Sequence, residues 1–344
     1  MGYGKIADKE REPKMIRKIG VYLMLFCLLA GLPGCSPAPQ EAQYFYAMDT
    51  LISLRLEGDD GTAFAACRAR VEELEQKFST TLDSSEIARL NREGSALLSE
   101  ETAAVLQAGL RISEATDQAF CLTLYPATRL WGFTGGTNRV PAAQELEAVR
   151  ALVDDRGLLL EGTQAALPSG AAVDLGGIAK GYAADCLDAL LAEYGITHAF
   201  LSLGGNVQVR GGNRDGSPWR VGIADPAGGD YIGVVALRDG AVVTSGGYQR
   251  NFTENGETYH HILDRGTLRP AESGLKSATV VAENGTLADG LSTALFVMGE
   301  ERAMAFCRER GDFECILITE DDRVVVSEGL KSSFTLHNTR YQYE

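Results

Sequence analysis

Three short stretches of the sequence hold residue types that could bind a phosphorylated ligand and act on it. In the first, we expect a strand to deliver Asp174, after which Gly176 and Gly177 precede a predicted helix. Glycines let a ligand approach the backbone, and free N–H groups at a helix start attract phosphate. Lys180 adds a cation on the first turn. The stretch is a candidate phosphate cradle, with Asp174 bonding to an uncharged part of the ligand. The alternative is a tight structural turn with a surface lysine.

The second stretch contains His260 and His261, which are half of the four histidines in the chain. Neighbouring side chains of a strand point to opposite faces, so these two are not expected to share one metal ion. Because histidine titrates near neutral pH, one of them could act as a general base. The alternative is a polar histidine whose hydrogen bonds are satisfied within a sheet.

The third stretch places Asp289, Ser292 and Thr293 at i, i+3 and i+4 of a predicted helix, so their side chains converge on one face. One carboxylate and two hydroxyls form a hard-oxygen set that suits Mg²⁺, which usually takes few protein ligands. The alternative is an aspartate that interacts with the helix end while the hydroxyls bond back to carbonyls one turn earlier. Together, a cradle, a metal site and a base favour phosphoryl chemistry.

Helices and strands must position these stretches. The alternating pattern of Thr50–Leu56 predicts a strand, and Ser85 is expected to open a short helix. A helix over residues 142–153 has Pro141 just inside its start. Helical spacing also marks residues 64–78 and 101–115, and strands are expected at 200–203, 219–224, 234–237, 241–244, 280–282, 315–320 and 323–327. Helices mixed with many antiparallel strands predict an α+β fold, with mixed or mostly antiparallel sheets and packed helices.

A basic N-terminus precedes an acidic body. Residues 1–34 carry six Lys/Arg and three Asp/Glu, whereas the whole chain has a net charge of −15. The apolar run after Lys18 is shorter than the ~20 residues of a membrane span, so residues 1–34 are typical of a secretory signal peptide, with Met15 as another possible start. Leu32-Pro33-Gly34-Cys35 resembles a bacterial lipobox, which predicts lipidation of Cys35, a tether over residues 35–43 and a membrane anchor outside the cytoplasm. The alternative is a plain cleaved signal peptide.

Composition excludes several classes of protein. Hydrophobic residues make up 45% of the chain and charged residues 23%, which is ordinary for a globular protein and excludes a disordered chain. The acidic balance disfavours nucleic-acid binding, for which a basic protein is expected. Apart from Cys27 and Cys35, five cysteines remain and none has CxxC spacing, so neither a disulfide framework nor a zinc site is expected.

Taken in order, the motifs resemble those of the ApbE family, the FAD:protein FMN transferases. The pieces that carry the resemblance are Met48-Asp49-Thr50, Ser84–Asn91, Leu130-Trp131-Gly132-Phe133, Asp174–Ala184, Gly204-Gly205-Asn206 and Trp219–Ile223. The resemblance implies one catalytic unit over residues 44–336, related to the T-fold, followed by a C-terminal tail over residues 337–344.

The resemblance also implies an activity. Enzymes of this family use FAD and a divalent metal, usually Mg²⁺, to attach FMN through a phosphoester bond to a Thr or Ser of an exported or membrane protein, and they release AMP. The acceptor would be a subunit of a redox-driven membrane complex or an exported flavoprotein. Two alternatives stay open, namely a metal-dependent FAD pyrophosphatase that yields FMN and AMP, and an exported flavin-binding lipoprotein without catalysis.

Individual roles follow from the same resemblance. It implies that His261 is the catalytic base and that Gly177, through its carbonyl, joins the metal site. The remaining metal ligands would be Asp289, Ser292 and Thr293, and the residues that touch FAD would be Met48, Ala119, Phe120, Cys121, Asp174, Lys180 and Ile262.

Four positions depart from the family pattern. Thr81 stands where an aromatic residue often stacks on the flavin, and Cys121 stands where many members have Asp. Gly247 replaces an acidic residue of the usual Ser-Gly-Asp-Tyr. The stretch Asp264–Leu268 replaces the common Asp-Pro-x-Thr-Gly, so that Leu268 occupies a glycine position. Weaker stacking on the flavin is the expected consequence at Thr81.

Overall fold

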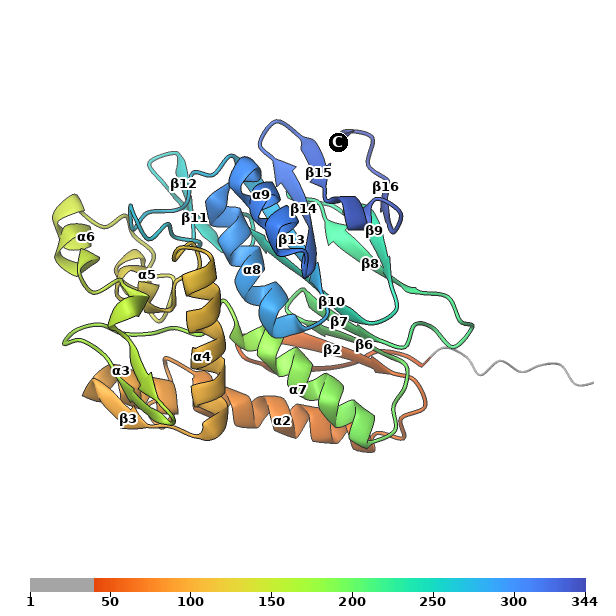
Figure 1. Ribbon diagram of the computed structural model, residues 1–344, viewed down its shortest axis with the longest axis horizontal. Helices are drawn as coiled ribbons and strands as arrows, with labels where there is room; N and C mark the ends of the chain where they lie inside the picture. Colours follow the sequence, from red (N-terminus) through yellow and green to blue (C-terminus); the bar gives the residue numbers. More distant parts are fainter. Residues whose placement is uncertain (1–39) are drawn as a thin grey trace, which may run out of the picture. The chain divides into compact units, whose positions relative to one another are not determined.

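The computed structural model describes residues 40–344, so the predicted signal peptide and Cys35 lie outside the described residues. A nine-stranded sheet forms its centre (Figure 1), and neighbouring strands are antiparallel except for the parallel pair β15–β17 at one edge. In order across the sheet, the strands are β1 (Gln43–Ala47), β2 (Thr50–Leu56), β6 (Ala199–Leu203), β7 (Asn206–Arg210), β10 (Gly240–Gly246), β13 (Leu275–Ala282), β14 (Phe313–Thr319), β15 (Arg323–Val326) and β17 (Gln342–Tyr343). The last strand lies within residues 337–344, the predicted tail.

Helices cover one face of this sheet (Figure 1). They are α2 (Thr62–Phe78), α7 (Ala179–Glu193), α8 (Gly285–Met298) and α9 (Glu300–Arg310), and α4 (Glu100–Ala115) packs against α8. The alternating pattern of β2 accounts for the contact, because Ile52, Leu54 and Leu56 are buried in the core under the helices. Leu51 points to the opposite face of β2 and is 56% exposed.

A smaller sheet covers part of the opposite face. Its strands, in order, are β16 (Phe334–Leu336), β9 (Tyr231–Leu237) and β8 (Trp219–Ala224). Strand β14 contributes to both cores, since Cys315 and Leu317 pack with the helices whereas Ile316 and Ile318 pack with the smaller sheet. A strand buried on both sides reads as a continuous apolar run, which is how residues 315–318 appear in the sequence.

A third group of elements lies beside the helices. It comprises α3 (Glu86–Glu93), α5 (Tyr125–Trp131), α6 (Ala143–Arg150), the small sheet of β3 (Ser95–Leu97), β5 (Gln164–Ala166) and β4 (Leu159–Glu161), and the hairpin of β11 (Asn251–Glu254) and β12 (Glu257–His260). Trp131 is fully buried in a small core that α5, α6, the hairpin and the loop after it share, and it donates its Nε1–H to the Leu268 carbonyl, at 2.9 Å. Through this bond α5 holds the loop that follows β12.

The predicted α+β class is confirmed, and two local predictions are wrong. Helix α6 begins at Ala143 with Ala142 as its N-cap, so Pro141 lies outside the helix. The strand expected to deliver Asp174 is absent, since residues 171–175 form no strand. The side chain of Asn91 takes the place of a neighbouring strand, because it accepts the Val173 N–H at 2.7 Å and donates to the Val173 carbonyl at 2.8 Å.

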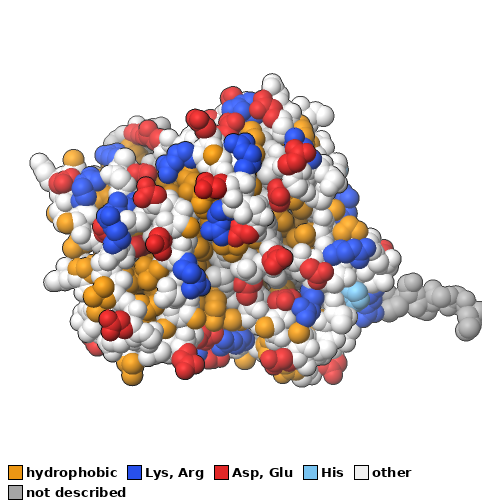
Figure 2. Space-filling view, viewed as in Figure 1, with side chains coloured by type: hydrophobic (Ala, Val, Ile, Leu, Met, Phe, Trp, Pro, Cys, Tyr) orange, Lys and Arg blue, Asp and Glu red, His pale blue; other side chains and the backbone are white. Residues whose placement is uncertain are grey.

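Both signs of charge are mixed on the face shown in Figure 2, where Lys and Arg side chains alternate with Asp and Glu rather than gather into a basic patch. Hydrophobic side chains collect on the left of this face, over the part that holds α3 and β3 in Figure 1. Within residues 40–344, no helix has the length and apolar character needed to cross a membrane.

Candidate active site

The phosphate-cradle stretch and the Asp289 helix meet where α7 and α8 cross. The Gly181 N–H, in the first turn of α7, donates to Asp289 Oδ2 at 2.9 Å. A Cβ on Gly181 would overlap the Gly285 carbonyl oxygen and lie 2.7 Å from Asp289 Cβ, so only glycine permits this approach. Two of the three stretches that the sequence singles out therefore form one site.

Three hydroxyl groups form a cluster where the end of β10 meets α8, the helix that carries Asp289. Ser245 Oγ, at the end of β10, lies 2.8 Å from Ser292 Oγ and 3.2 Å from Thr293 Oγ1. Ser292 is fully buried and its hydroxyl also bonds to the Asp289 carbonyl at 2.9 Å, which is part of the structural alternative considered for this stretch. A Cβ on Gly177 would lie 3.6 Å from Thr293 Oγ1, so Gly177 borders the same cluster.

These donors fit a hard divalent cation. Asp289 is only 4% exposed, and its Oδ1 has no hydrogen-bond partner among residues 40–344. A buried carboxylate with one open oxygen, beside hydroxyl and carbonyl oxygens, matches the ligand preference of Mg²⁺. Within the described residues no group of three or more His, Cys, Asp or Glu could hold a metal, so a metal at Asp289 would need hydroxyl, carbonyl or water oxygens as its other ligands.

The turn before α7 differs from the expected cradle of free amides. Ile178 and Ala179 donate to the Leu175 carbonyl at 2.9 Å and 2.8 Å, and Gly176 donates to Asp174 Oδ1 at 2.8 Å. Several N–H groups of this turn are thus already engaged within the chain. Lys180, whose Nζ donates to the Gly176 carbonyl at 3.2 Å, is the cation that remains for an anionic ligand.

Asp174 and His261 face the same two positive charges. Burial raises the pKa of Asp174, while the Gly176 N–H and the charges of Lys180 and Arg250 act in the opposite direction. Burial lowers the pKa of His261 to about 4, and the positive charges of Arg250 and Lys180 lower it further. The hydrogen bond to the Arg250 carbonyl acts in the opposite direction and raises it. The residues from the first two stretches therefore share one electrostatic environment.

The two histidines occupy opposite faces, as predicted. His261 Nδ1 lies 3.2 Å from the Arg250 carbonyl, which can only accept, so Nδ1 carries the hydrogen and Nε2 keeps a free lone pair. His260 packs edge-on against Phe296 instead, and its Nε2 lies 3.2 Å from the Ala271 carbonyl. Burial lowers the pKa of both rings and each keeps one nitrogen free, so what marks His261 as the candidate base is its place near Lys180 and Arg250, the charges that also act on Asp174.

The turn between β1 and β2 joins this environment through Arg250. Met48 has a left-handed backbone, with φ of 51°, and its N–H donates to Glu75 Oε1 at 2.9 Å. The next residue, Asp49, pairs with Arg250 at 3.2 Å. Met48 is thus connected to the segment that holds His261.

The stretch 119–121 lies against the turn before α7. Phe120 is buried, and its Cε2 would lie 3.0 Å from a Cβ on Gly177. Cys121 Sγ donates to the buried Asp155 carboxylate at 3.3 Å, and burial raises the pKa of this thiol. Ala119 and Ile262 pack at the edge of the same core. Thr81, at the position of the expected flavin stack, is exposed.

Four residues of this environment carry no role in the sequence interpretation. Ser245 completes the hydroxyl cluster, and Arg250 joins the Met48 turn to His261. Asn91 accepts the N–H of the residue before Asp174, and Asp155 accepts the N–H of the residue after Cys121. Their partners are distant in the sequence, so local spacing gives no signal for them. The family resemblance does mark two of them, because Asn91 ends the stretch Ser84–Asn91 and Ser245 begins the stretch compared with Ser-Gly-Asp-Tyr.

Comparisons with known proteins identify the family. A model described as the ApbE family matches residues 48–317. The FAD:protein FMN transferase of Vibrio cholerae is 34% identical over 88% of this chain and 94% of its own length, and that of Treponema pallidum is 32% identical over 95% and 98%. The solved ApbE protein of Thermotoga maritima has a TM-score of 0.80 at 32% identity and covers 85% of this chain and 98% of its own. This chain belongs to the ApbE family.

Proposed function

We propose that this chain is a flavin transferase that uses FAD and Mg²⁺ to attach FMN to a Thr or Ser hydroxyl of a protein acceptor. The observation that carries the proposal is the meeting of Asp289, Thr293 and Gly177 with Lys180. The names of the relatives, FAD:protein FMN transferase, support the same reaction.

Oxygen atoms of this chain would hold the metal. Its ligands would be drawn from Asp289 Oδ1, Thr293 Oγ1, the hydroxyl of the buried Ser292 and the Gly177 carbonyl, a set that the contacts of Asp289 with α7 and of Gly177 with Thr293 support. A bound Mg²⁺ would neutralise the pyrophosphate and polarise the phosphorus on the FMN side. Lys180 adds a fixed positive charge to the same group, so that it orients the pyrophosphate and stabilises charge that develops during transfer.

His261 would remove the proton from the incoming hydroxyl. Its Nε2 lone pair is free because Nδ1 donates to the Arg250 carbonyl. The acceptor oxygen then forms a bond to the FMN phosphorus as the bond from that phosphorus to the bridging oxygen breaks, and AMP leaves with the bridging oxygen. The products are an FMN phosphodiester on the acceptor, AMP and one proton.

Asp174 would recognise the nucleoside rather than transfer protons. Its carboxylate is fixed by the Gly176 N–H and can still accept a hydrogen bond from adenine or ribose. Met48, Ala119, Phe120, Cys121 and Ile262 would supply mostly apolar contacts for the rest of FAD.

The proposed place of action is the outer face of a bacterial membrane. The lipobox-like Leu32–Cys35 supports an anchor through a lipid on Cys35, and the acidic body of the chain supports a protein acceptor over nucleic acid. The acceptor would accordingly be an exported or membrane-bound protein.

One assay tests the reaction. The purified protein is incubated with FAD, Mg²⁺ and peptides that carry a single central Thr, and mass spectrometry follows AMP and the peptide masses. A peptide gain equal to FMN less water, with AMP released, is the expected result. AMP and free FMN without an adduct would instead indicate an FAD pyrophosphatase. FAD that is bound but unchanged would indicate a flavin-binding lipoprotein.

A further inference from the structure

Strand β1 forms an edge of the large sheet that no described strand covers. Among residues 40–344, β1 pairs with β2 on one side and with no strand on the other. Proteins usually protect such an edge with a very short strand, charged side chains or proline. The strand at the opposite edge, β17, has only two residues, whereas β1 has five, none of them charged and none proline. The edge of β1 is therefore open to pairing with an added strand.

The open edge presents backbone groups of Tyr44 and Tyr46. The Leu51 carbonyl accepts the Gly204 N–H at 3.2 Å, on the side of β2 that faces β6. Leu51 lies opposite Tyr46 across β1 and β2, so these two residues form a pair without hydrogen bonds to each other. The N–H and C=O groups of Tyr46, and of Tyr44 two residues earlier, thus point away from β2, and they have no partner among the described residues.

The side chains at this edge form an exposed, mostly apolar strip. Tyr44 is 61% exposed and Tyr46 is 68% exposed, and both share with Leu51 the face of the sheet turned away from the helices. A strand added to β1 would place alternate side chains on that face beside the two tyrosines. Aromatic and β-branched residues stabilise such cross-strand pairs. An extended polypeptide with apolar residues at alternate positions therefore fits the backbone groups and the side chains together.

A series of contacts joins this strip to the proposed base. Tyr46 donates its hydroxyl to Asp49 Oδ1 at 3.3 Å, and Asp49 pairs with Arg250 at 3.2 Å. The Arg250 carbonyl accepts the backbone N–H of His261 at 3.0 Å and lies 3.2 Å from its Nδ1. The end of β1 that carries Tyr46 is thus the end next to the reaction.

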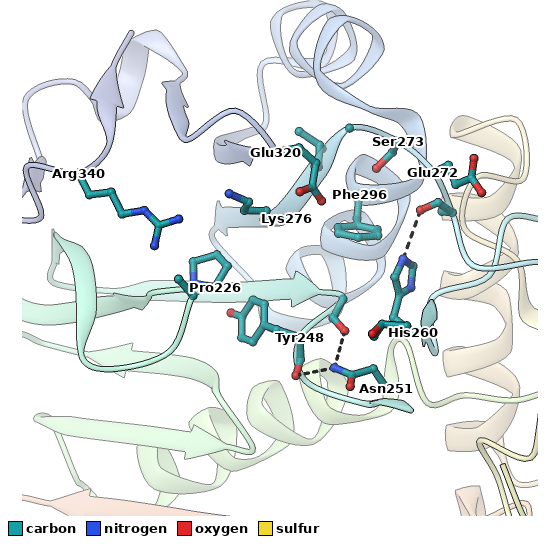
Figure 3. Close-up of a pocket in the computed structure, with 16 residues that line it drawn as sticks. Pro226, Tyr248, Asn251, His260, Glu272, Ser273, Lys276, Phe296, Glu320 and Arg340 are labelled. Carbon is teal, nitrogen blue, oxygen red and sulfur yellow. Dashed lines mark hydrogen bonds between the residues drawn. The ribbon is translucent and has the colours of Figure 1, made fainter. Parts of the chain in front are cut away.

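The turn that carries Arg250 is itself fixed. Asn251, which Figure 3 shows beside a pocket, donates from Nδ2 to the carbonyls of Gly247 and Tyr248, both at 3.1 Å. Arg250 can therefore hold Asp49 with its side chain and His261 with its carbonyl at the same time.

The described chain enters β1 at the end away from this site. Gln40 accepts the Gly58 N–H at 2.8 Å and donates to the Asp59 carbonyl at 2.9 Å, and both of these residues follow the end of β2. The turn that joins β1 to β2 lies at the other end of the hairpin. The Tyr46 end of the edge therefore faces the site rather than the start of the body.

The open stretch ends at the turn, because Glu75 accepts the next outward N–H, that of Met48, at 2.9 Å. A polypeptide paired with Tyr44 and Tyr46 would leave the edge there, beside Arg250 and His261. We infer that the acceptor polypeptide adds as a strand to the open edge of β1 and that its continuation presents the receiving hydroxyl at His261. The inference rests on the proposed function and extends it to recognition of the acceptor.

Peptides that cannot pair test the inference with the wild-type protein. Starting from the peptide with a single Thr that the assay above modifies fastest, two series carry N-methyl groups on alternate residues, before or after the Thr, and differ in position by one residue. Only alternate residues of a strand bond to a given neighbour. On one side of the Thr, one series should raise the acceptor KM at least about tenfold, whereas the other should stay within about twofold of the parent peptide.

A pair of variants tests the same edge from the protein side. Tyr44→Pro removes an N–H that points outward, so every bond between β1 and β2 is kept. Tyr44→Val is the matched control, because it loses the same ring but keeps the N–H and favours a strand. The acceptor KM of Tyr44→Pro should exceed that of Tyr44→Val by about 3- to 10-fold, the range expected for one lost hydrogen bond.

The readouts separate this inference from the proposed function. Affinity for FAD, from quenching of flavin fluorescence, and AMP release without acceptor should be the same in both variants as in the wild type. Equal KM values for the two methylated series, or for the two variants with FAD affinity retained, would overturn the inference. A dimer in light scattering that Tyr44→Pro dissociates without changing KM would assign the edge to a second copy of this chain and would also overturn it. Wild-type protein that releases no AMP with any peptide would overturn the proposed function and the inference with it.

Discussion

At the scale of single residues, His261 is set apart by its low pKa, about 4, which burial and the nearby cations produce. An ordinary histidine, with a pKa near 6.5, would be largely protonated at pH 5, whereas His261 still has its free lone pair there. We expect kcat/KM for transfer to stay level from pH 8 down to about pH 5 and to fall as the pH approaches 4. Steady-state rates of AMP release in the presence of acceptor measure this.

His261→Ala is the control for that profile. The variant should lose about 10²- to 10⁴-fold in kcat, the usual contribution of a general base, and its residual rate should lack the fall near pH 4. Circular dichroism at each pH excludes unfolding as the cause. A wild-type midpoint near pH 6.5 would contradict the assignment of the base.

Asp289 has two roles that one substitution can separate. An amide oxygen in Asp289→Asn can still accept the Gly181 N–H, so the free energy of unfolding without metal should change by less than about 1 kcal/mol. The lost negative charge should raise the Mg²⁺ concentration for half-maximal AMP release at least about tenfold. Thermal unfolding in a chelator and a magnesium titration measure the two effects.

Asp289→Ala removes both roles and should show both losses. If the Asn variant responds to magnesium as the wild type does, then Asp289 serves only to hold the start of α7 and does not bind the metal.

At the scale of elements, the site depends on how closely α7 and α8 approach. Gly181→Ala would place a Cβ against the Gly285 carbonyl and Asp289, and because backbone atoms cannot turn aside, the helices must separate. We expect a loss of at least about 2–3 kcal/mol in unfolding free energy, together with a weaker magnesium response. Gly222→Ala, where the new Cβ would lie 3.4 Å from Tyr231, is the matched control and should cost little. Equal stability of the two variants would contradict the close packing.

The loop after β12 has a strained residue at its centre. Leu268 has φ of 57° yet is fully buried next to Trp131, so its side chain stabilises a backbone that a glycine would adopt freely. Leu268→Gly should still destabilise the protein by about 1–3 kcal/mol, because the lost burial exceeds the ~1–2 kcal/mol of relieved strain.

Leu268→Ala keeps the strain and loses the burial. It should be less stable than the glycine variant by about 1 kcal/mol, as measured by denaturant unfolding. A glycine variant more stable than the wild type would mean that packing against Trp131 contributes little.

Elements with a strong periodic pattern could be predicted from the sequence, and those held by distant side chains could not. The strand over Thr50–Leu56 is present at those bounds because its apolar residues alternate. The segment before Asp174 has the same local character, but a side chain from α3 takes the place of a neighbouring strand. For the site, i, i+3 spacing indicates the face that Asp289 and Ser292 share. That Asp289 bonds to Gly181, 108 residues away, depends on how the helices cross.

At the scale of the whole molecule, the chain length between the proposed lipid and the folded body limits where the enzyme can act. Seven residues lie between Cys35 and the start of β1 at Gln43, which makes eight steps along the chain. An extended chain gains at most ~3.6 Å per step, so this segment can reach no more than ~29 Å. An acceptor would then have to present its hydroxyl near the membrane surface.

The anchor itself is testable by partition. Produced in a bacterium that processes lipoproteins, the wild-type protein should enter the detergent phase of a Triton X-114 extraction, because acyl chains on Cys35 supply the only strong membrane affinity expected for an acidic body. Cys35→Ser should stay in the aqueous phase and transfer FMN to a soluble peptide at the wild-type rate, since the site lies wholly within residues 48–293. Wild-type protein in the aqueous phase would support a plain cleaved signal peptide. The acceptor would then not need to present its hydroxyl near the membrane surface. Detergent partition of the Cys35→Ser protein would mean that the folded body binds the membrane itself.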